Sequence, residues 1–208
     1  MIAYKVVTLG SSGVGKTSIV LRHVRGEYSD STVSTIGASF LVKNMELPSK
    51  ERLRLEIWDT AGQERYSSLA PMYYRAAQVA LIVYDVTDLD SWDRAREWVQ
   101  TLKNGERADI LKVLIGNKID METQRVVTKQ DAQKYAGDEG IMHVEVSART
   151  GMGVSAVFSS ITNILVAART TIKDNVGEIE SGIIRLHQQR QSRCKSVVGK
   201  IVSFCGIF

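Results

Sequence analysis

The chain has 208 residues, a net charge of +4, 44% hydrophobic residues and 24% charged residues. These are globular values, and the length supports one domain of ordinary size with a substantial core, plus a tail. No apolar run approaches the roughly 20 residues of a transmembrane helix, so we expect no membrane-spanning segment. We also expect no secretory signal, because residues 1–5 lack a basic and apolar leader, and no N-myristoyl group, because Ile2 replaces the required glycine.

The positive charge is concentrated towards the C-terminal end. Residues 169–208 hold seven Lys or Arg and three Asp or Glu, which leaves the rest of the chain without net charge. A neutral body with a basic tail argues against a nucleic-acid-binding face and for contact between the tail and an anionic surface. Both cysteines, Cys194 and Cys205, lie in the same stretch. We therefore expect no disulfide framework in the body, which suits a reducing cytosol.

One motif organises the first part of the chain. Gly10 to Thr17 has the spacing of a phosphate-binding P-loop: glycine, four residues, then Gly-Lys-Thr. Its glycines allow successive N–H groups to point into one anion-sized concavity, and the following helix adds partial positive charge. Lys16 is expected to reach the β- and γ-phosphates, and the Thr17 hydroxyl to bind the accompanying Mg²⁺. The alternative is a Gly/Ser-rich turn that binds nothing, and the strand before it and helix after it argue against that alternative.

Strand-like and helix-like segments alternate along the chain, with a loop at 26–34 and a turn at 48–50. Strands are expected at 2–9, 39–47, 53–58, 79–84, 110–115 and 141–146, and helices at 18–25, 91–102, 128–135 (with Thr128 as N-cap) and 154–168. This alternation predicts the α/β class, with a mostly parallel sheet covered on both faces and a nucleotide at the carboxyl ends of its strands. We expect one domain over 1–170 and a flexible basic tail over 171–208.

A second polar cluster, Asp59-Thr60-Ala61-Gly62-Gln63-Glu64, follows the strand expected at 53–58. A carboxylate from Asp59 at the strand end can hold the Mg²⁺ shell from the side opposite Thr17. Gly62 has no side chain, so its N–H can approach a terminal phosphate closely, and the Gln63 amide is placed to orient an attacking water. We therefore assign Lys16, Gly62 and Gln63 to catalysis, although a turn without a ligand would have a similar pattern.

The tetrapeptide Asn117-Lys118-Ile119-Asp120 follows another expected strand. One carboxylate can accept two hydrogen bonds from the N1–H and 2-amino groups of guanine. Adenine has no such pair of donors and would leave Asp120 unpaired, which is costly in a closed site. Ser147-Ala148-Arg149, at the next strand end, can add a backbone N–H to the guanine O6. Taken alone this tetrapeptide would fit a solvated turn; its position after the other two motifs favours guanine recognition.

Taken together and in this order, these motifs resemble the small GTPases of the Ras superfamily, over residues 1–170. The resemblance implies a three-layer P-loop GTPase fold with a mostly parallel six-stranded sheet and helices on both faces. Residues 34–40, 58–66 and 73–77 are similar to the Rab family of membrane-trafficking GTPases. Residues 68–75, with 35–41, are similar to the early-endosome group of Rabs.

The resemblance assigns further roles. Thr35 would complete the Mg²⁺ coordination begun by Thr17 and Asp59, and Tyr28 would pack near the guanine edge. Phe40, Trp58 and Tyr73 match the aromatic triad through which effectors recognise Rabs, with Ile36 beside them, although plain core packing is an equal alternative for Trp58. The residues expected to contact GTP or GDP are Ser12, Gly13, Val14, Gly15, Lys16, Thr17, Ser18, Tyr28, Thr35, Gly62, Asn117, Lys118, Asp120, Ser147, Ala148 and Arg149.

Three positions depart from the family pattern. Ser12 stands where Ras proper has glycine, and serine is ordinary in Rabs. Arg149 replaces the usual lysine of the guanine loop, where the backbone carries the contact. Ala76 stands where Rabs usually have glycine and is expected to alter slightly the segment that corresponds to switch II, residues 62 to about 75.

The end of the chain, Cys205-Gly206-Ile207-Phe208, matches a prenylation box, and a terminal Phe favours geranylgeranyl. Most Rabs end with two cysteines. A single lipid anchors weakly, so the basic residues between 185 and 200, or a palmitate on Cys194, would supply a second signal. A frayed tail with an accidental cysteine is the alternative.

The resemblance also implies partners and a location. It predicts an exchange factor, a GTPase-activating protein, a GDP-dissociation inhibitor and effectors. It places the chain on the cytoplasmic face of endomembranes, at early endosomes or related vesicles, and in the cytosol when the GDP form is extracted. Two other classes stay open: an ATP-dependent P-loop kinase, disfavoured by the placement of Asn117 to Asp120, and a nucleotide-locked scaffold, disfavoured by intact Thr35, Gly62 and Gln63.

Overall fold

The computed structural model describes residues 2–30, 35–47, 51–62, 70–105 and 108–169. The chain divides into two compact units, Met1–Ser159 and Ser160–Phe208, and the sheet lies in the first of them. The strands are β1 (Ile2–Leu9), β2 (Ala38–Glu46), β3 (Arg52–Thr60), β4 (Val79–Asp85), β5 (Leu111–Asn117) and β6 (Met142–Glu145). The helices are α1 (Lys16–Arg25), α2 (Ala70–Tyr74), α3 (Leu89–Asn104), α4 (Lys129–Glu139), a 3₁₀ helix η2 (Ile119–Gln124) and a helical stretch over 154–169.

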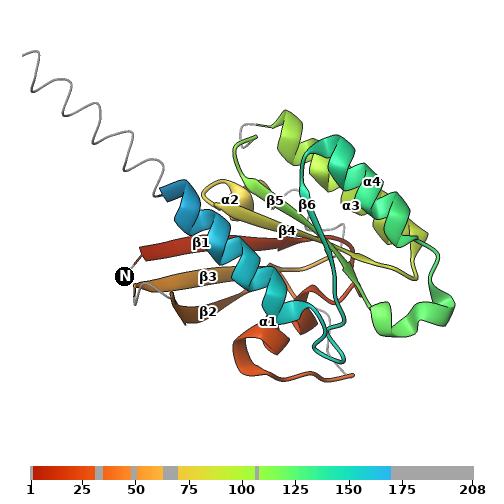
Figure 1. Ribbon diagram of the computed structural model, residues 1–208, viewed down its shortest axis with the longest axis horizontal. Helices are drawn as coiled ribbons and strands as arrows, with labels where there is room; N and C mark the ends of the chain where they lie inside the picture. Colours follow the sequence, from red (N-terminus) through yellow and green to blue (C-terminus); the bar gives the residue numbers. More distant parts are fainter. Residues whose placement is uncertain (1, 31–34, 48–50, 63–69, 106–107, 170–208) are drawn as a thin grey trace, which may run out of the picture. The chain divides into compact units, whose positions relative to one another are not determined.

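The six strands form one sheet in the order β2-β3-β1-β4-β5-β6 (Figure 1). β2 runs antiparallel to β3, and every other neighbouring pair is parallel. Parallel strands joined by crossover helices bring their carboxyl ends to one edge, where a ligand is expected. The predicted α/β class and mostly parallel six-stranded sheet are confirmed.

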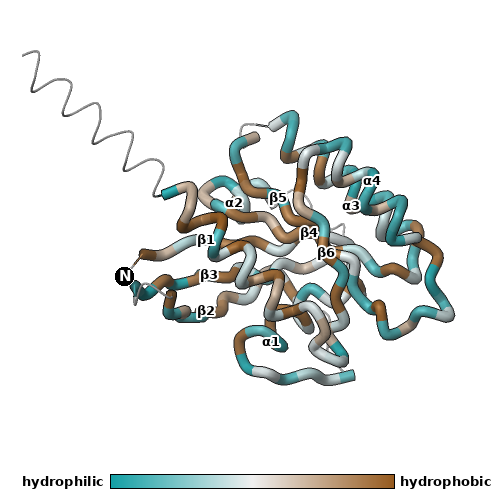
Figure 2. The backbone as a smooth tube through the Cα atoms, viewed as in Figure 1, coloured by the Kyte–Doolittle hydropathy of each residue, from teal (hydrophilic) through white to brown (hydrophobic). Residues whose placement is uncertain are grey.

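Helices cover both faces of this sheet. α1 packs against β3 and β2, whereas α3 packs against β4 and α4 against β6. Every residue of β4 is buried, as expected of a central parallel strand. Figure 2 shows the same distribution: hydrophobic residues gather on the strands, and hydrophilic residues on the outer sides of α3 and α4. The core under α3 and α4 contains Val7, Leu9, Ala80, Ile82, Tyr84, Val86, Trp92, Ala95, Val99, Leu102, Leu114, Ala132 and Ala136.

Capping side chains and one glycine dihedral angle fix where three of the helices begin. The predicted N-cap Thr128 is confirmed, since its Oγ1 accepts from the Asp131 backbone N–H at 3.1 Å. Asp88 caps α3 in the same way, with Oδ1 accepting from the Asp90 N–H at 3.1 Å. α1 begins two residues earlier than predicted, because Gly15 adopts a left-handed φ of 92° and turns the chain directly into the helix at Lys16.

Two elements have no counterpart in the sequence prediction. α2 has only five residues and η2 is a kinked 3₁₀ segment, so neither is long enough to show a periodic apolar pattern. The part of the expected loop at 26–30 has no helix or strand, while residues 31–34 and the predicted turn at 48–50 lie outside the described residues. Across the described ranges, no helix combines the length and apolar character needed to cross a bilayer.

Candidate active site

A cavity of about 320 Å³ opens at the carboxyl ends of the parallel strands. The segments that line it follow β1, β3, β5 and β6, so residues far apart in the sequence meet there. All the predicted nucleotide-contacting residues line it except Val14 and Ser147, which are buried behind the cavity wall. Four lining residues that were not among the predicted contacts are Ser29, Asp30, Met121 and Thr60, the last of which lies inside the motif at 59–64.

The P-loop conformation depends on glycine at two positions. Gly10 has a φ of 135°, and a Cβ there would lie 2.2 Å from the Val83 carbonyl oxygen in β4. Gly15 has a φ of 92°, and a Cβ there would lie 2.3 Å from Asn117 Nδ2. Side chains are therefore excluded by both the dihedral angle and the space. The loop lies tightly against β4 and against the residue that ends β5.

Lys16 lies at the phosphate end of the cavity. The residue is buried, and its Nζ donates to the carbonyl oxygens of Gly10 at 2.9 Å and Ser11 at 2.8 Å. Burial lowers the pKa of the ammonium to about 8, and the Asp59 carboxylate acts in the opposite direction. A confined cation whose charge is only partly balanced is suited to bind a polyphosphate.

Oxygen atoms from three segments meet beside Lys16. Thr17 Oγ1 donates to Asp59 Oδ2 at 2.6 Å and lies 2.9 Å from Thr35 Oγ1. The fully buried Asp59 also accepts from Thr8 Oγ1 at 3.1 Å. Burial raises the pKa of this carboxyl, against hydrogen bonds from Thr17 and Thr8 and the charge of Lys16 that lower it. Two hydroxyls and one carboxylate form a hard, all-oxygen donor set of the kind that Mg²⁺ prefers.

Gly62 lies against the phosphate loop. A Cβ at this position would be 2.4 Å from both Lys16 Nζ and the Ser11 carbonyl oxygen, so only glycine allows the approach. The predicted water-orienting Gln63 lies outside the described residues, as do Cys205, which is predicted to carry a lipid, and the second cysteine, Cys194.

Asn117 joins the phosphate end of the cavity to the opposite end. Its Nδ2 donates to the Val14 carbonyl oxygen at 2.8 Å, and its Oδ1 accepts from the Ala148 N–H at 3.0 Å. The side chain therefore connects the P-loop with residues 147–149, here called the guanine loop. Val14 and Ala148 are separated by more than half of the chain and are linked through this amide.

At the end of the cavity opposite the P-loop, two charged side chains of the tetrapeptide 117–120 are held by residues outside it. Asp120 Oδ1 accepts from Ser147 Oγ at 2.5 Å, which orients the carboxylate. Lys118 has a left-handed φ of 71°, and its Nζ pairs with Asp85 Oδ2 at 2.5 Å. Asp85 ends β4 and is buried, and its Oδ1 also accepts from the Thr87 N–H and hydroxyl. Asp85 carried no recognisable sequence signal, because its role depends on the strand beside it.

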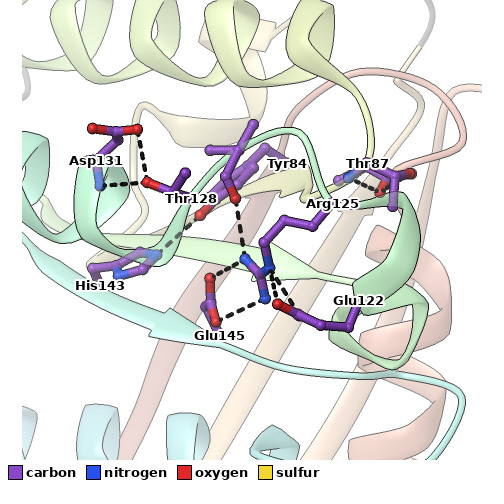
Figure 3. Close-up of polar contacts among 10 residues, drawn as sticks. Tyr84, Thr87, Glu122, Arg125, Thr128, Asp131, His143 and Glu145 are labelled. Carbon is purple, nitrogen blue, oxygen red and sulfur yellow. Dashed lines mark hydrogen bonds and ion pairs between the residues drawn. The ribbon is translucent and has the colours of Figure 1, made fainter.

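An arginine supports the same end from behind. The Arg125 guanidinium donates to Glu145 Oε1 at 2.7 Å and Oε2 at 3.2 Å, and to Glu122 Oε2 at 2.8 Å (Figure 3). Burial acts to lower its pKa, but the hydrogen bonds and charges of the Glu145 and Glu122 carboxylates together outweigh burial, so the pKa is raised. Glu145 ends β6, just before Ser147, and Glu122 lies in η2 with Asp120. The two ion pairs of Arg125 therefore connect the segment that carries Ser147 with the segment that carries Asp120.

The family comparison agrees with this geometry. The Ras family model matches residues 5–167, which is most of the chain. The chain belongs to the Ras family. It is therefore a small GTPase that binds guanine nucleotides, hydrolyses GTP and acts through regulators and effectors, and its cavity holds the motifs expected to bind the nucleotide.

In this Ras-family GTPase the three aromatic residues of the predicted effector triad, Phe40, Trp58 and Tyr73, lie together near the β2–β3 edge of the sheet. Phe40 and Trp58 contact edge to face with ring centroids 5.3 Å apart, and Trp58 lies 6.1 Å from Tyr73. Phe40 is 48% exposed and Ile36 is 84% exposed, whereas Trp58 and Tyr73 are partly buried against the core. Trp58 thus packs against the core and contacts the exposed Phe40, and its role in effector recognition stays a prediction.

Proposed function

We propose that this Ras-family GTPase is a Rab-type switch that regulates vesicular membrane traffic at early endosomes. The observation that carries the proposal is the aromatic row Phe40–Trp58–Tyr73, with the exposed Ile36 beside it. Ile36 and Phe40 are exposed beside the partly buried Trp58 and Tyr73, and an apolar patch of this kind is typical of a surface that a partner covers. The row follows the residues expected to sense the γ-phosphate, so effector binding can depend on the bound nucleotide.

In the proposed reaction, water attacks the γ-phosphorus of GTP while the bond to the β–γ bridging oxygen breaks, releasing GDP and phosphate. Lys16 and the Gly62 N–H hold the phosphate oxygens on which charge develops. Gln63 orients the attacking water and forms no covalent intermediate. Catalysis is then positioning and charge stabilisation, so intrinsic turnover is slow and an activating protein accelerates it.

Thr17, Thr35 and Asp59 would hold a Mg²⁺ ion with the nucleotide, because their oxygen atoms already lie together. The ion supplies charge neutralisation between the phosphates when bound. Thr35 lies in the segment that the resemblance identifies as switch I, residues 26–40, so it links the phosphate end of the cavity to the neighbouring exposed Ile36.

We further propose that Cys205 is geranylgeranylated and that the basic residues between 185 and 200 add attraction to an anionic membrane. The partners would be an exchange factor, an activating protein, effectors and a GDP-dissociation inhibitor that returns the GDP form to the cytosol. The cytoplasmic face of early endosomes or related vesicles is the proposed location.

Imaging and fractionation of the tagged full chain test this function. Wild type and Gln63→Leu should co-localise with early-endosome markers, and Thr17→Asn, which is expected to favour GDP, should be largely cytosolic. Cys205→Ser should leave the membrane fraction, while the matched control Cys194→Ser should leave it less. A Cys205→Ser protein that stays membrane-bound would exclude prenylation, and wild-type protein on another compartment would exclude the endosomal assignment.

Single-turnover hydrolysis separates the switch from a scaffold that binds nucleotide without turnover. Gln63→Leu should keep GTP affinity and lose hydrolysis, both alone and with an activating protein. Equal rates for wild type and Gln63→Leu would remove this residue from the mechanism.

A further inference from the structure

Arg22 is a residue that the nucleotide motifs do not include. It lies on α1, is half-buried and is not part of the cavity lining. Its Nε donates to the Ala148 carbonyl oxygen at 2.9 Å, its Nη2 donates to the Arg149 carbonyl oxygen, and its Nη1 donates to the Gly26 carbonyl oxygen at 3.0 Å. One guanidinium thus joins the helix behind the P-loop to the guanine loop.

The first of these contacts sets the direction of a donor in the cavity wall. The described chain has no cis peptide bond, so the carbonyl and N–H of the peptide between residues 148 and 149 point in opposite directions. Because Arg22 holds the Ala148 carbonyl, the Arg149 N–H faces away from α1. Ala148 and Arg149 both line the cavity.

The second contact leads to the carboxylate expected to recognise guanine. Arg22 holds the Arg149 carbonyl, and the N–H of the same peptide, on Thr150, donates to Ser147 Oγ at 3.0 Å. Ser147 Oγ in turn donates to Asp120 Oδ1 at 2.5 Å. A continuous series of hydrogen bonds therefore runs from Arg22, through one peptide and one hydroxyl, to Asp120.

We propose that Arg22 is a positioning residue for guanine selectivity, which orients the guanine loop and, through Ser147, the Asp120 carboxylate. The inference rests on the proposed contact of Asp120 with the N1–H and 2-amino groups of guanine. A planar guanidinium donates to carbonyls of two successive residues and to a third on its own helix cap, which a lysine ammonium cannot reproduce in the same plane. The aliphatic stem also packs beside Gly151, where a Cβ would lie 3.7 Å from Arg22 Cδ.

The test compares GDP with inosine diphosphate, which keeps the phosphates, the ribose and N1–H and lacks the 2-amino group. Equilibrium affinities for both nucleotides are measured on the full chain for wild type, Arg22→Met and Arg22→Lys. Arg22→Met keeps the stem and removes all donors. It should weaken GDP binding about tenfold and inosine diphosphate binding only about threefold, because the second hydrogen bond to Asp120 forms only where the 2-amino group is present. The GDP preference should then fall about threefold, and Arg22→Lys should recover part of it.

Arg25→Met is the matched control, because Arg25 lies about one turn along the same helix and its exposed guanidinium pairs with Glu27 at 3.9 Å rather than with the guanine loop. It should leave both affinities unchanged. Equal weakening of the two nucleotides in Arg22→Met, with a lower melting temperature, would mean that Arg22 only stabilises the fold, and an unchanged GDP affinity would also overturn the inference. A wild-type protein that does not prefer GDP over inosine diphosphate would instead overturn the proposed contact of Asp120.

Discussion

The two ends of the nucleotide cavity are built in different ways. At the phosphate end, one continuous loop between β1 and α1 is shaped by its own glycines. Gly10 and Gly15 both have positive φ angles, 135° and 92°. At the guanine end, short segments after β5 and β6 are held by side chains from elsewhere, including Asp85, Arg22 and Arg125. The phosphate loop is therefore shaped mainly by local backbone geometry, whereas the segments of the guanine end are held mainly by tertiary contacts. Substitutions at the two ends should therefore fail in different ways.

The largest effect is expected at the phosphate end, from Gly10→Ala. The new Cβ would lie 2.2 Å from the Val83 carbonyl oxygen of a central strand, so the sheet or the loop must shift. We expect a loss of about 3 kcal/mol or more in the free energy of unfolding, measured by denaturation at saturating GDP. Gly13→Ala is the control, because Gly13 also has a positive φ of 79° and nothing lies within 4 Å of its Cβ position. It should cost only about 1 kcal/mol, and equal losses would show that packing against β4 is unimportant.

At the guanine end, Asp120→Asn should change selectivity and leave folding intact. The amide would place a donor opposite the guanine 2-amino group, which costs on the order of 1–3 kcal/mol of GTP binding, or about fivefold to 150-fold in affinity. Xanthine has a carbonyl in place of that amine, so affinity for xanthosine triphosphate should rise. Competition binding of the two nucleotides measures the reversal. If the variant binds both nucleotides more weakly to the same extent, Asp120 is a structural turn residue.

A smaller effect is expected at the guanine end when the ion pair between Asp85 and Lys118 is removed. Asp85→Asn removes the ion pair with Lys118 but keeps an acceptor for Thr87. Because Lys118 is partly exposed, we expect GDP to dissociate only about threefold to fivefold faster, measured with a fluorescent GDP analogue. Asp85→Ala removes the Thr87 contacts as well. If only the alanine variant releases GDP faster, the turn at Thr87 matters and the ion pair does not.

The smallest effect lies at neither end of the cavity. His23 stacks on Phe158 with ring centroids 3.7 Å apart, its Nε2 is buried without a partner among the described residues, and burial and then the charge of Lys43 lower its pKa to about 4. Protonation is therefore harder in the folded state, so stability should be constant above the ordinary pKa near 6.5 and fall as the pH falls towards 4. Between pH 7 and pH 6 the loss should be about 0.7 kcal/mol.

His23→Phe keeps the stacking and should remove this part of the pH dependence, measured by chemical denaturation at both pH values. Burial also lowers the pKa of His143, which is present in both proteins and should leave a residual slope in the variant. GDP affinity should be unchanged, because His23 does not line the cavity. An unchanged slope in His23→Phe would contradict the assignment.

The order of strands and helices, and most of the residues lining the cavity, could be predicted because they depend on short-range information. Apolar runs and glycine spacing indicate buried strands and the P-loop whatever the rest of the chain does. The boundaries moved by one to a few residues, as at α1, where a single glycine dihedral angle decides the first turn. α2 and η2 were missed because five or six residues show no period.

The amino-acid sequence alone thus determined the fold class, through the alternation of strand-like and helix-like segments. It also determined the phosphate loop, because that motif and its dihedral angles lie within eight consecutive residues. It did not contain a readable signal for Thr8 beside Asp59, Asp85 beside Lys118, or Arg22 on the guanine loop. Each of these pairs is separated by tens of residues or more and acts through one hydrogen bond or ion pair a few ångströms long. Only the parallel register of the strands and the packing of α1 bring such partners within that distance, so the tertiary structure alone decided them.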